Sequence, residues 1–523
     1  MRLFHDAQST AQWLRRQVTG VLHCDSRQVR QGDGFVAWPG AARDGRQFVP
    51  SALEAGAAAV VVEHTGVDAF DLDTQAPIAA VPSLKALAGP IASAFCQNPS
   101  GQLDMVAITG TNGKTSSAWW VAQLLSACGR ECGLVGTLGM GRVPRVGQGT
   151  DTPVLVPTGL TTPDPVRLQQ RLRQFVDEGV QACAIEASSI GLVEGRLNGT
   201  RIRVAVFTNF TQDHLDFHGD MERYWAAKAM LFDWPGLQAA VVNLDDPKGI
   251  ELAARLTDRP VDLWTVAVEP TEQSLPARLA ATRLAFTTEG MGWTLVERDA
   301  QGQAVAELDM VLPMVGRYNV SNLLGVLAAA RALGIPLEQA TGACAALTPV
   351  PGRMQTVGVP TGVAGHGLPC VLVDYAHTPD ALEKALRALQ PLARQRGGAL
   401  WVVVGCGGDR DRSKRPQMAG VAAREAAHVV FTSDNPRSED PRRILQDMLA
   451  GLQDPERARV VTDRAEAIGQ AVALAAPEDV VLVAGKGHED YQEIQGVQRP
   501  FSDAAQVRAA LMARLQQAAG GAV

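Results

Sequence analysis

The sequence predicts an α/β protein with three domains. Its 523 residues are too many for one hydrophobic core. Short apolar runs of strand length alternate with helical stretches along much of the chain, which is typical of parallel sheets covered by helices on both faces. Several of these runs end in polar residues, and such sheets bind ligands at the carboxyl ends of their strands. The pattern therefore also predicts where the functional site lies.

The composition is typical of a globular enzyme and argues against other classes of protein. Hydrophobic residues make up 46% and charged residues 20% of the chain. The net charge of −7 argues against a nucleic-acid-binding protein, which needs a basic face. No apolar run approaches the roughly 18 residues of a membrane span, and the N-terminus lacks a secretory signal pattern. The eight cysteines include no CxxC pair, so we expect reduced thiols and a cytoplasmic location.

Residues 1–98 are predicted to form a small N-terminal α/β domain. Its apolar runs at 35–38, 57–64 and 76–81 are expected to be strands, with helices between and after them. The turn at residues 25–27 could bind a polar ligand, although most such turns only reverse the chain. The sequence Asn-Pro-Ser-Gly that follows this unit is typical of a linker.

A glycine-rich turn carries the strongest functional signal of the second unit. A buried strand is predicted at 105–109, the turn occupies 110–114, and a helical pattern follows. Backbone N–H groups in such a turn and the positive end of a helix dipole bind phosphate. Lys114 would contact the outer phosphates, and the Thr115 hydroxyl would bind Mg²⁺. Ile108 stands where the usual phosphate loop has its first glycine, so this is a shorter form of the motif.

Further strands of this unit also end in polar residues, namely Glu186, Asn209 and Asn243. A carboxylate beside a phosphate-binding turn is a natural Mg²⁺ ligand, but Glu186 could equally be an ordinary acid in a turn. From 279 to 314 the pattern alternates between apolar and polar residues, which predicts a small antiparallel sheet. The second unit is therefore expected to be a phosphate-loop domain with a mainly parallel sheet.

Two residues of this unit have both a functional and an ordinary interpretation. His214 lies close to acidic residues and could bind a metal ion, or it could be a loop histidine with satisfied hydrogen bonds. Lys228 has aromatic and apolar neighbours that would partly bury it, and burial lowers the pKa of a lysine. Spacing alone favours the alternative, a surface lysine extending along an amphipathic helix.

The third unit begins near residue 348 and is predicted to be a second, Rossmann-like α/β domain. Each of its apolar runs at 370–374, 399–404, 428–433 and 479–484 leads into a polar, mostly glycine-rich loop. A fold needs turns there, but it does not need His, Arg, Asp and Lys in them. Arg410 and Arg437 lie in two of these loops and could bind a ligand with carboxylates, although a surface ion pair is the common alternative for either.

The chain carries in one order the motifs TGTNGKTSS, EASSIGL, TQDHLDFHGDMERYWAAK, GRYNVSN, PGRMQ, DYAHTPD, GDRDRSKRP and DNPRSEDP. Together they resemble the Mur ligase family of peptidoglycan precursor synthesis. The resemblance covers all three units. It implies a UDP-MurNAc-binding domain at 1–98, an ATP-binding domain at 99–347 and an amino-acid-binding domain at 348–523.

The resemblance implies an ATP-dependent acid–amino-acid ligase that releases ADP. ATP would phosphorylate the D-Glu carboxylate of UDP-MurNAc-L-Ala-D-Glu, and the amino group of the incoming amino acid would then form the amide. The DNPR sequence resembles the form that selects meso-2,6-diaminopimelate over lysine. The family further implies a cytoplasmic monomer that acts on small molecules during cell wall biogenesis, cell shape maintenance and cell division, without a nucleic-acid partner or a membrane span.

The resemblance also implies roles for individual residues. Catalytic roles fall to Lys114, Lys228, His214 and Glu186. ATP would contact Gly110, Thr111, Asn112, Gly113, Lys114, Thr115, Ser116, Asn319, Arg353, Asp374 and His377. Mg²⁺ would be bound by Thr115, Glu186, His214 and a carbamylated Lys228. The UDP-MurNAc-dipeptide would contact Ser26, Thr161, Thr162, Ser188, Glu194 and Arg196. Diaminopimelate would contact Arg410, Asp434, Asn435, Pro436, Arg437, Gly485 and Glu489.

The sequence departs from the family pattern near the nucleotide-sugar site. The uridine loop has Ala41, Ala42 and Arg43 where His-Gln-Ala is common, Ile190 replaces a frequent histidine, and Glu194 replaces a glutamine. A carboxylate at 194 would repel the diphosphate, so we expect it to turn away.

Three alternatives remain. A lysine-adding ligase would leave Arg437 without a carboxylate partner, and a ligase resembling folylpolyglutamate synthase would lack the first domain and DNPR. A non-catalytic descendant should have lost Lys114, Glu186, Lys228 or Arg437.

Overall fold

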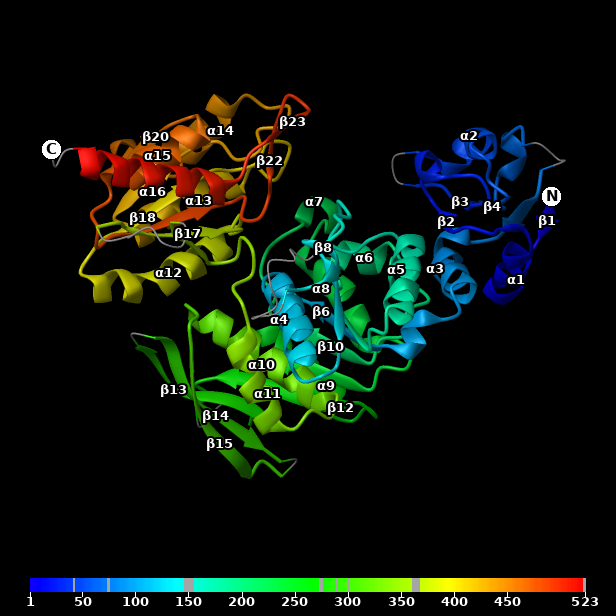
Figure 1. The fold of residues 1–523 in the computed structure, drawn as a ribbon, viewed down its shortest axis with the longest axis horizontal. Helices are drawn as coiled ribbons and strands as arrows, with labels where there is room; N and C mark the ends of the chain where they lie inside the picture. The colour runs from blue at the N-terminus through cyan, green and yellow to red at the C-terminus, as the bar shows by residue number, and fades with distance from the viewer. Residues whose placement is uncertain are drawn as a thin grey trace.

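The computed structural model describes residues 1–40, 43–72, 76–144, 155–271, 276–287, 289–299, 301–359 and 367–520, with side chains up to residue 517. Ala41 and Ala42 of the uridine loop lie outside these residues. Within the described chain, the strands form sheets of five, ten and six strands and a separate two-stranded hairpin. In Figure 1 the blue N-terminal part and the yellow-to-red C-terminal part lie on either side of the cyan-to-green central part. The predicted three-part α/β architecture is confirmed.

The first sheet is parallel throughout and has the order β1-β5-β4-β3-β2. Its inner strands are buried on both faces, which explains why they are continuous apolar runs rather than alternating ones. The elements of this part are β1 (Arg2–Leu3), α1 (Ala7–Gln17), β2 (Leu22–His23), β3 (Gly34–Ala37), α2 (Val49–Glu54), β4 (Ala59–Glu63), β5 (Ile78–Val81) and α3 (Leu84–Phe95).

The predicted linker after this sheet is a packed 3-10 turn, Pro99–Gln102, rather than a loose connection. Ser100 is buried, and its hydroxyl accepts a hydrogen bond of 2.9 Å from the backbone N–H of Arg201. Nearby, a Cβ on Gly89 of α3 would lie 2.0 Å from the carbonyl oxygen of Asn198. The N-terminal and central parts are therefore in close contact through α3 and the turns around Ser100 and Asn198, which the linker composition did not indicate.

The central sheet has the order β15-β14-β13-β12-β11-β10-β6-β9-β7-β8. The neighbouring strands β13, β12, β11, β10, β6, β9 and β7 pair in parallel. At one edge β8 pairs antiparallel with β7, and at the other β14 and β15 add antiparallel strands. The predicted antiparallel segment therefore extends the parallel sheet. The strands are β6 (Asp104–Thr109), β7 (Cys132–Gly136), β8 (Gly139–Arg142), β9 (Ala182–Glu186), β10 (Val204–Phe207), β11 (Ala239–Asn243), β12 (Asp262–Val268), β13 (Leu279–Thr287), β14 (Gly290–Arg298) and β15 (Ala304–Leu312).

Helices cover both faces of the central sheet. One face packs against α4 (Lys114–Ala127), α10 (Arg317–Ala332) and α11 (Leu337–Ala343). The other face packs mainly against α5 (Pro165–Asp177) and α9 (Pro247–Leu256). Three shorter helices follow the strand ends, namely α6 (Ser189–Val193), α7 (Leu215–His218) and α8 (Met221–Ala229). The helix α4 is buried almost all round, because it packs against α10 as well as against the sheet.

The C-terminal sheet has the order β16-β17-β21-β18-β19-β20, and only β16 is antiparallel. One face packs against α12 (Pro379–Arg396), α13 (Lys414–Glu425) and α14 (Pro441–Leu449), and the other against α15 (Arg464–Leu474) and α16 (Asp503–Gly520). The strands are β16 (Gln355–Val357), β17 (Cys370–Asp374), β18 (Leu400–Val404), β19 (His428–Phe431), β20 (Ala458–Val460) and β21 (Val480–Ala484), followed by the hairpin β22 (Tyr491–Ile494) and β23 (Val497–Pro500). Within the described residues, no helix combines the length and the apolarity needed to cross a membrane.

Candidate active site

The glycine-rich turn lies at the carboxyl end of β6 and leads into α4, which begins at Lys114, the last residue of the predicted turn. Gly110 and Gly113 have φ angles of +148° and +85°, which L-residues with a Cβ rarely adopt. A Cβ at these positions would lie 1.9 Å from Thr208 Oγ1 and 2.4 Å from Asn322 Oδ1, respectively. The glycines therefore let the turn approach the neighbouring strand end and α10 closely.

Two lysines meet at this turn. Lys114 Nζ donates hydrogen bonds to the carbonyl oxygens of Gly110 (2.7 Å) and Thr111 (2.8 Å), and Lys228 Nζ donates to the same Gly110 oxygen (2.8 Å). Lys228 is only 1% exposed, so the surface-lysine interpretation is wrong. Burial lowers the pKa of Lys228 well below its usual value, and the charge of Lys114 adds to this effect. Burial also lowers the pKa of Lys114.

The Glu186 carboxylate lies beside the turn and is held by three donors. Its Oε2 accepts hydrogen bonds from Thr115 Oγ1 (2.9 Å) and Thr137 Oγ1 (3.2 Å), and its Oε1 accepts one from the Thr137 N–H (2.8 Å). Arg353 of the C-terminal part donates to Thr115 Oγ1 at 3.1 Å. A Cβ on Gly136 would lie 2.3 Å from Glu186 Oε1, so this carboxylate has no room to turn.

The Thr115 hydroxyl and the Glu186 carboxylate are hard oxygen ligands that suit Mg²⁺. Among the described residues, no group of three His, Cys, Asp or Glu side chains could hold a metal ion alone. The donor set therefore fits a Mg²⁺ ion that is also bound by phosphate oxygens and water, as is common at phosphate-binding turns.

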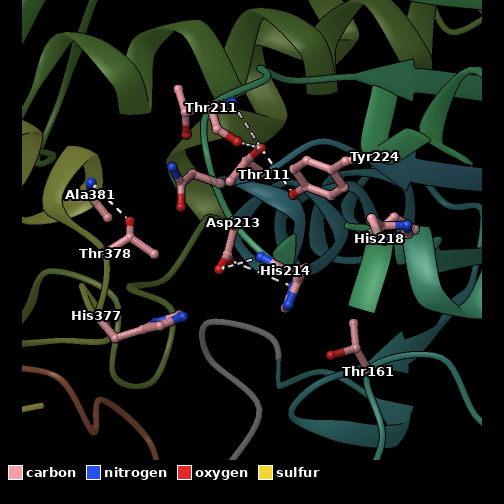
Figure 2. A network of polar contacts seen from close by, with 12 residues as sticks. Thr111, Thr161, Thr211, Asp213, His214, His218, Tyr224, His377, Thr378 and Ala381 are labelled. Atoms are coloured by element: carbon pink, nitrogen blue, oxygen red, sulfur yellow. Dashed lines mark hydrogen bonds and ion pairs between the residues drawn. The ribbon is translucent and has the colours of Figure 1, made fainter. Parts of the chain in front are cut away.

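His214 and Asp213 lie on the loop after β10, facing the C-terminal part (Figure 2). Burial lowers the pKa of His214 to about 4, so its imidazole is neutral at pH 7 and able to bind a metal ion. Burial tends to raise the pKa of Asp213, but nearby positive charge lowers it, namely that of Lys414 and that of the His377 and His214 imidazoles once they are protonated at low pH. Lys414 Nζ lies 2.8 Å from Asp213 Oδ1, which ties the C-terminal loop 405–414 to the central sheet.

A second polar contact between the two parts involves Asp380, which we did not predict. Its Oδ2 accepts hydrogen bonds from Asn112 Nδ2 (3.1 Å) of the phosphate turn, Thr211 Oγ1 (3.2 Å) and Lys384 Nζ (3.0 Å). Asp380 is the last residue of the DYAHTPD motif. Because its partners Asn112 and Thr211 lie far away in sequence, these hydrogen bonds could not be predicted. Together, Lys414 and Asp380 hold the two halves of the site against each other.

Tyr224 is another residue that we missed. Its hydroxyl lies 3.2 Å from Thr111 Oγ1, which itself donates to the Thr211 carbonyl at 3.0 Å (Figure 2). Lys228 Nζ lies 4.4 Å from the centre of the Tyr224 ring. The four-residue spacing of Tyr224 and Lys228 on a helix places them on one face, and this signal was available in the sequence.

A cavity of about 680 Å³ opens between the central and C-terminal parts. Predicted ATP-binding residues line it, namely Asn112, Gly113, Ser116, Asn319, Arg353, Asp374 and His377. The Arg353 guanidinium also stacks 4.4 Å from the centre of the Tyr375 ring. Three apolar side chains that we did not predict, Leu284, Phe286 and Met291, come from β13 and β14. The antiparallel extension of the sheet therefore supplies an apolar part of the cavity lining.

The polar loops of the C-terminal sheet meet at one edge, as predicted. The register of β17, β21, β18 and β19 places Asp374, Ala484, Val404 and Phe431 level with one another. The predicted residues that follow these ends are Arg410, Asp434, Asn435, Pro436, Arg437, Gly485 and Glu489. Arg410 is exposed, Arg437 and Glu489 are partly buried, and the other four are buried.

Asn435 and Glu489 are held by a buried lysine that we missed, Lys486. Its Nζ donates to Asn435 Oδ1 (2.9 Å) and Glu489 Oε2 (2.8 Å), and Asn435 Nδ2 donates to the same Glu489 oxygen (2.8 Å). Arg437 has a φ angle of +53°, and its Nη1 donates to the Gly408 carbonyl at 2.7 Å. Its Nε lies 3.7 Å from Glu493 Oε2 on the hairpin β22–β23.

A third cluster of predicted residues lies at the carboxyl end of β9. Thr162 Oγ1 donates to the Glu186 carbonyl (2.7 Å) and lies 2.9 Å from Ser188 Oγ, and Arg196 donates to the Thr162 carbonyl (3.1 Å). Thr161 Oγ1 lies 3.1 Å from the Thr137 hydroxyl oxygen. Glu194 pairs with Lys85 of α3 at 2.7 Å. Three other residues were named for the nucleotide-sugar site from the sequence: Ser26 lies in a 3-10 turn of the first part, Ile190 lies in α6, and Arg43 is exposed.

Comparison with known proteins gives matches along most of the chain. The family models described as "Mur ligase family, catalytic domain", "Mur ligase middle domain" and "Mur ligase, glutamate ligase domain" match residues 19–92, 108–330 and 352–487. The UDP-N-acetylmuramoyl-L-alanyl-D-glutamate--2,6-diaminopimelate ligases of Acidovorax sp. (strain JS42) and Janthinobacterium sp. (strain Marseille) are 54% and 47% identical, over 97% and 95% of both chains. A solved structure of a ligase with the same name is 35% identical and aligns over 95% of both chains with a TM-score of 0.62.

Proposed function

The chain belongs to the Mur ligase family, and we propose that it joins meso-2,6-diaminopimelate to the D-Glu carboxylate of UDP-MurNAc-L-Ala-D-Glu with ATP as co-substrate. One arrangement carries this proposal. The phosphate-binding turn with Lys114, Lys228 and Glu186 faces the C-terminal sheet, whose loops carry Arg437 and Glu489. The ion pair of Lys414 with Asp213 holds these halves together.

The reaction has two steps. A D-Glu carboxylate oxygen attacks the γ-phosphorus of ATP, ADP leaves, and an acyl phosphate forms. The amino group of the incoming amino acid then attacks the carbonyl carbon and loses a proton, and phosphate leaves with the former carboxylate oxygen. We assign positioning and charge stabilisation to the protein, without a covalent nucleophile, as is typical of phosphoryl transfer.

The phosphate turn would supply most of this stabilisation. The N-terminus of α4 and the Lys114 ammonium offer positive charge to the β- and γ-phosphates of ATP. Mg²⁺, when bound, neutralises charge on the phosphate oxygens, with Thr115 and Glu186 as its first protein ligands. The neutral imidazole of His214 would hold a second ion together with a carbamylated Lys228, and the lowered pKa of Lys228 supports this because carbamylation needs a neutral amine.

The substrate residues follow from the charges of the C-terminal loops. Diaminopimelate has a carboxylate and an ammonium at each end, whereas lysine has only an ammonium at its distal end. We assign the distal carboxylate to Arg437 and the distal ammonium to Glu489, whose Oε2 is already fixed by Asn435 and Lys486. Arg410 would bind the other carboxylate. Lysine would leave the Arg437 guanidinium facing an aliphatic chain end.

We further propose that residues 1–98, 99–347 and 348–523 are the UDP-MurNAc-, ATP- and amino-acid-binding domains, each built on one of the three main sheets. Thr161, Thr162, Ser188 and Arg196 would contact the UDP-MurNAc-dipeptide. Glu194 lies at the edge of this proposed site, and its ion pair with Lys85 offsets the negative charge that would otherwise repel the diphosphate. We also propose a cytoplasmic monomer, in keeping with eight unpaired cysteines. Light scattering during size-exclusion chromatography tests the oligomeric state.

An amide-formation assay tests the substrate directly. The protein is incubated with ATP, Mg²⁺, UDP-MurNAc-L-Ala-D-Glu and one amino acid at a time, and ADP and the UDP-linked product are quantified. We expect product with meso-diaminopimelate and far less with lysine or with the LL isomer. Equal or better turnover of lysine would contradict the assignment of Arg437, and absence of product with every amino acid would contradict the proposed reaction.

A further inference from the structure

A fully buried ion pair lies beneath the loops 434–437 and 485–489 of the C-terminal part, to which we assigned diaminopimelate. Arg464 is the first residue of α15 and Asp503 is the first residue of α16. Both side chains are 0% exposed. Arg464 Nε and Nη2 donate to the two carboxylate oxygens of Asp503, each at 2.7 Å, in a bidentate arrangement.

The remaining contacts of the guanidinium reach two strand ends. Arg464 Nη1 donates to the Ser433 carbonyl at 3.2 Å, and Nη2 donates to the Ala484 carbonyl at 2.9 Å. Ser433 immediately precedes Asp434 of the DNPR loop, and Ala484 immediately precedes Gly485. In the sheet order, β19 and β21 lie on either side of β18 and do not pair with each other. The guanidinium therefore joins two loops that no strand pairing joins.

These two loops are in close contact above the guanidinium. Gly485 has a φ angle of +118°, and a Cβ there would lie 2.4 Å from Asp434 Oδ2. The backbone at Gly485 and the Asp434 side chain thus fit against each other without spare space. A shift of either carbonyl that Arg464 holds would move the neighbouring loop and the groups that it presents.

Folding alone does not require a charged pair at this position. A buried ion pair usually stabilises a protein no more than apolar side chains of similar volume, because both charges must be removed from water. Apolar side chains, however, could not donate to the Ser433 and Ala484 carbonyls. The specific contribution of the pair is thus the relative position of the two loops.

We propose that Arg464 and Asp503 are positioning residues for the amino-acid subsite. Arg464 fixes the starts of the 434–437 and 485–489 loops, and Asp503 fixes Arg464 from the C-terminal helix. This inference rests on the proposed function, since it takes these loops to bind diaminopimelate. Because neither the phosphate turn nor the nucleotide-sugar cluster contacts the pair, the effect should be confined to one substrate.

The double variant Arg464→Met/Asp503→Leu tests this in the full-length protein. It removes both charges together and leaves no unpaired buried charge, so the melting temperature should fall only by the loss of the hydrogen bonds to the Ser433 and Ala484 carbonyls. We expect the KM for diaminopimelate to rise about tenfold or more, since small displacements of positioning groups have large effects. The KM values for ATP and UDP-MurNAc-L-Ala-D-Glu should change less than about twofold. Arg464→Lys, which keeps the charge but loses the planar fork, should raise the KM for diaminopimelate in the same direction.

Asp479→Asn is the matched control. The Asp479 carboxylate is also buried, and it accepts hydrogen bonds from the backbone of Ala399 (2.7 Å) and Ala476 (2.8 Å) and from Trp401 Nε1 (2.8 Å). It lies just before β21, at the opposite end of that strand from Ala484. We expect this variant to lower the melting temperature and to leave the KM for diaminopimelate unchanged.

Two results would overturn the positioning role. One is a KM for diaminopimelate like that of the wild type in both Arg464 variants. The other is an equal rise of that KM in Asp479→Asn, which would mean that general destabilisation explains the effect. A wild-type protein that does not use diaminopimelate at all would instead contradict the proposed function, so the two failures are distinguishable.

Discussion

Lys228 Nζ and Lys114 Nζ donate hydrogen bonds to the same acceptor, the carbonyl oxygen of Gly110, at 2.8 and 2.7 Å. Two ammonium groups this close repel each other, and burial removes the water that would screen them. The fully buried Lys228 is therefore the better candidate for the neutral state, as the direction of its pKa shift indicates. A neutral amine at this point can react with carbon dioxide to form a carbamate, whose negative charge would complement Lys114.

The first prediction concerns the chemical role of Lys228. Lys228→Ala should lower kcat by about a thousandfold or more, because it removes the carbamate that would hold the second metal ion beside the reacting phosphates. Added bicarbonate or short carboxylates should partly restore activity by filling the space of the carbamate. Lys248→Ala is the control, since Lys248 is a partly exposed residue of α9 that pairs with Glu251. Turnover of Lys228→Ala at the wild-type rate would refute the carbamate role.

The second prediction concerns the space around Glu186. Gly136→Ala should push the Glu186 carboxylate away from Thr115, because the added Cβ would lie 2.3 Å from Oε1. We expect activity or apparent Mg²⁺ affinity to fall about 10- to 100-fold, as for other groups that orient metal ligands. The measurement is the rate as a function of Mg²⁺ concentration. Gly342→Ala, where a Cβ would meet open space in α11, should behave like the wild type, and an unchanged Mg²⁺ response in Gly136→Ala would argue against Glu186 as a ligand.

The third prediction concerns substrate selection by Arg437. Arg437→Ala should raise the KM for diaminopimelate about 30-fold or more, because truncating one partner of a charge pair typically costs about 2 kcal/mol or more. The KM for ATP should remain almost unchanged. Arg424→Ala removes an exposed arginine of α13 that pairs with Glu425, and it should affect neither constant. Comparable rises of both KM values in Arg437→Ala would mean that Arg437 is mainly structural.

The fourth prediction concerns the pH dependence of stability at His488, whose ring lies 5.4 Å from that of Tyr375. Burial lowers the pKa of His488 from 6.5 to about 4. Between these values the unfolded chain binds more protons than the folded chain, so the folded state loses stability as the pH falls through this window. The full effect is at most about 3 kcal/mol.

Melting temperatures of the wild type and His488→Gln between pH 7.5 and 4.5 measure this effect. The wild type should lose stability more steeply than the variant below about pH 6.5, because only the wild type carries the titrating imidazole. His64→Gln, which changes an exposed histidine of the first part, should follow the wild-type curve. Parallel curves for the wild type and His488→Gln would show that His488 is not held in its neutral form.

Features that depend on local sequence were predicted well. Parallel strands buried on both faces must be continuous apolar runs, so the polar residue that ends each run, such as Glu186 or Asp374, marks the edge where ligands bind. The start of α5 was also predictable, because the Asp164 carboxylate accepts hydrogen bonds from the next turn and Pro165 suits the first helical position.

Features that depend on packing between distant segments were not predictable. The environment of Lys228 is an example, since spacing suggested a surface residue and only the packing of α8 against the phosphate turn buries it. The partners of Asp380, and the pairing of Arg464 with Asp503, likewise lie far away in sequence. The pairing of Glu194 with Lys85 likewise could not be named from the sequence.

The central claim is that ATP activates the D-Glu carboxylate as an acyl phosphate before the amide forms. The most direct measurement uses UDP-MurNAc-L-Ala-D-Glu with ¹⁸O at both oxygens of the D-Glu carboxylate that reacts, together with ATP and diaminopimelate, and analyses the released phosphate by mass spectrometry. One ¹⁸O atom should appear in phosphate for each amide formed, because the phosphate leaves with a former carboxylate oxygen. Phosphate without ¹⁸O, at normal amide yield, would contradict the mechanism.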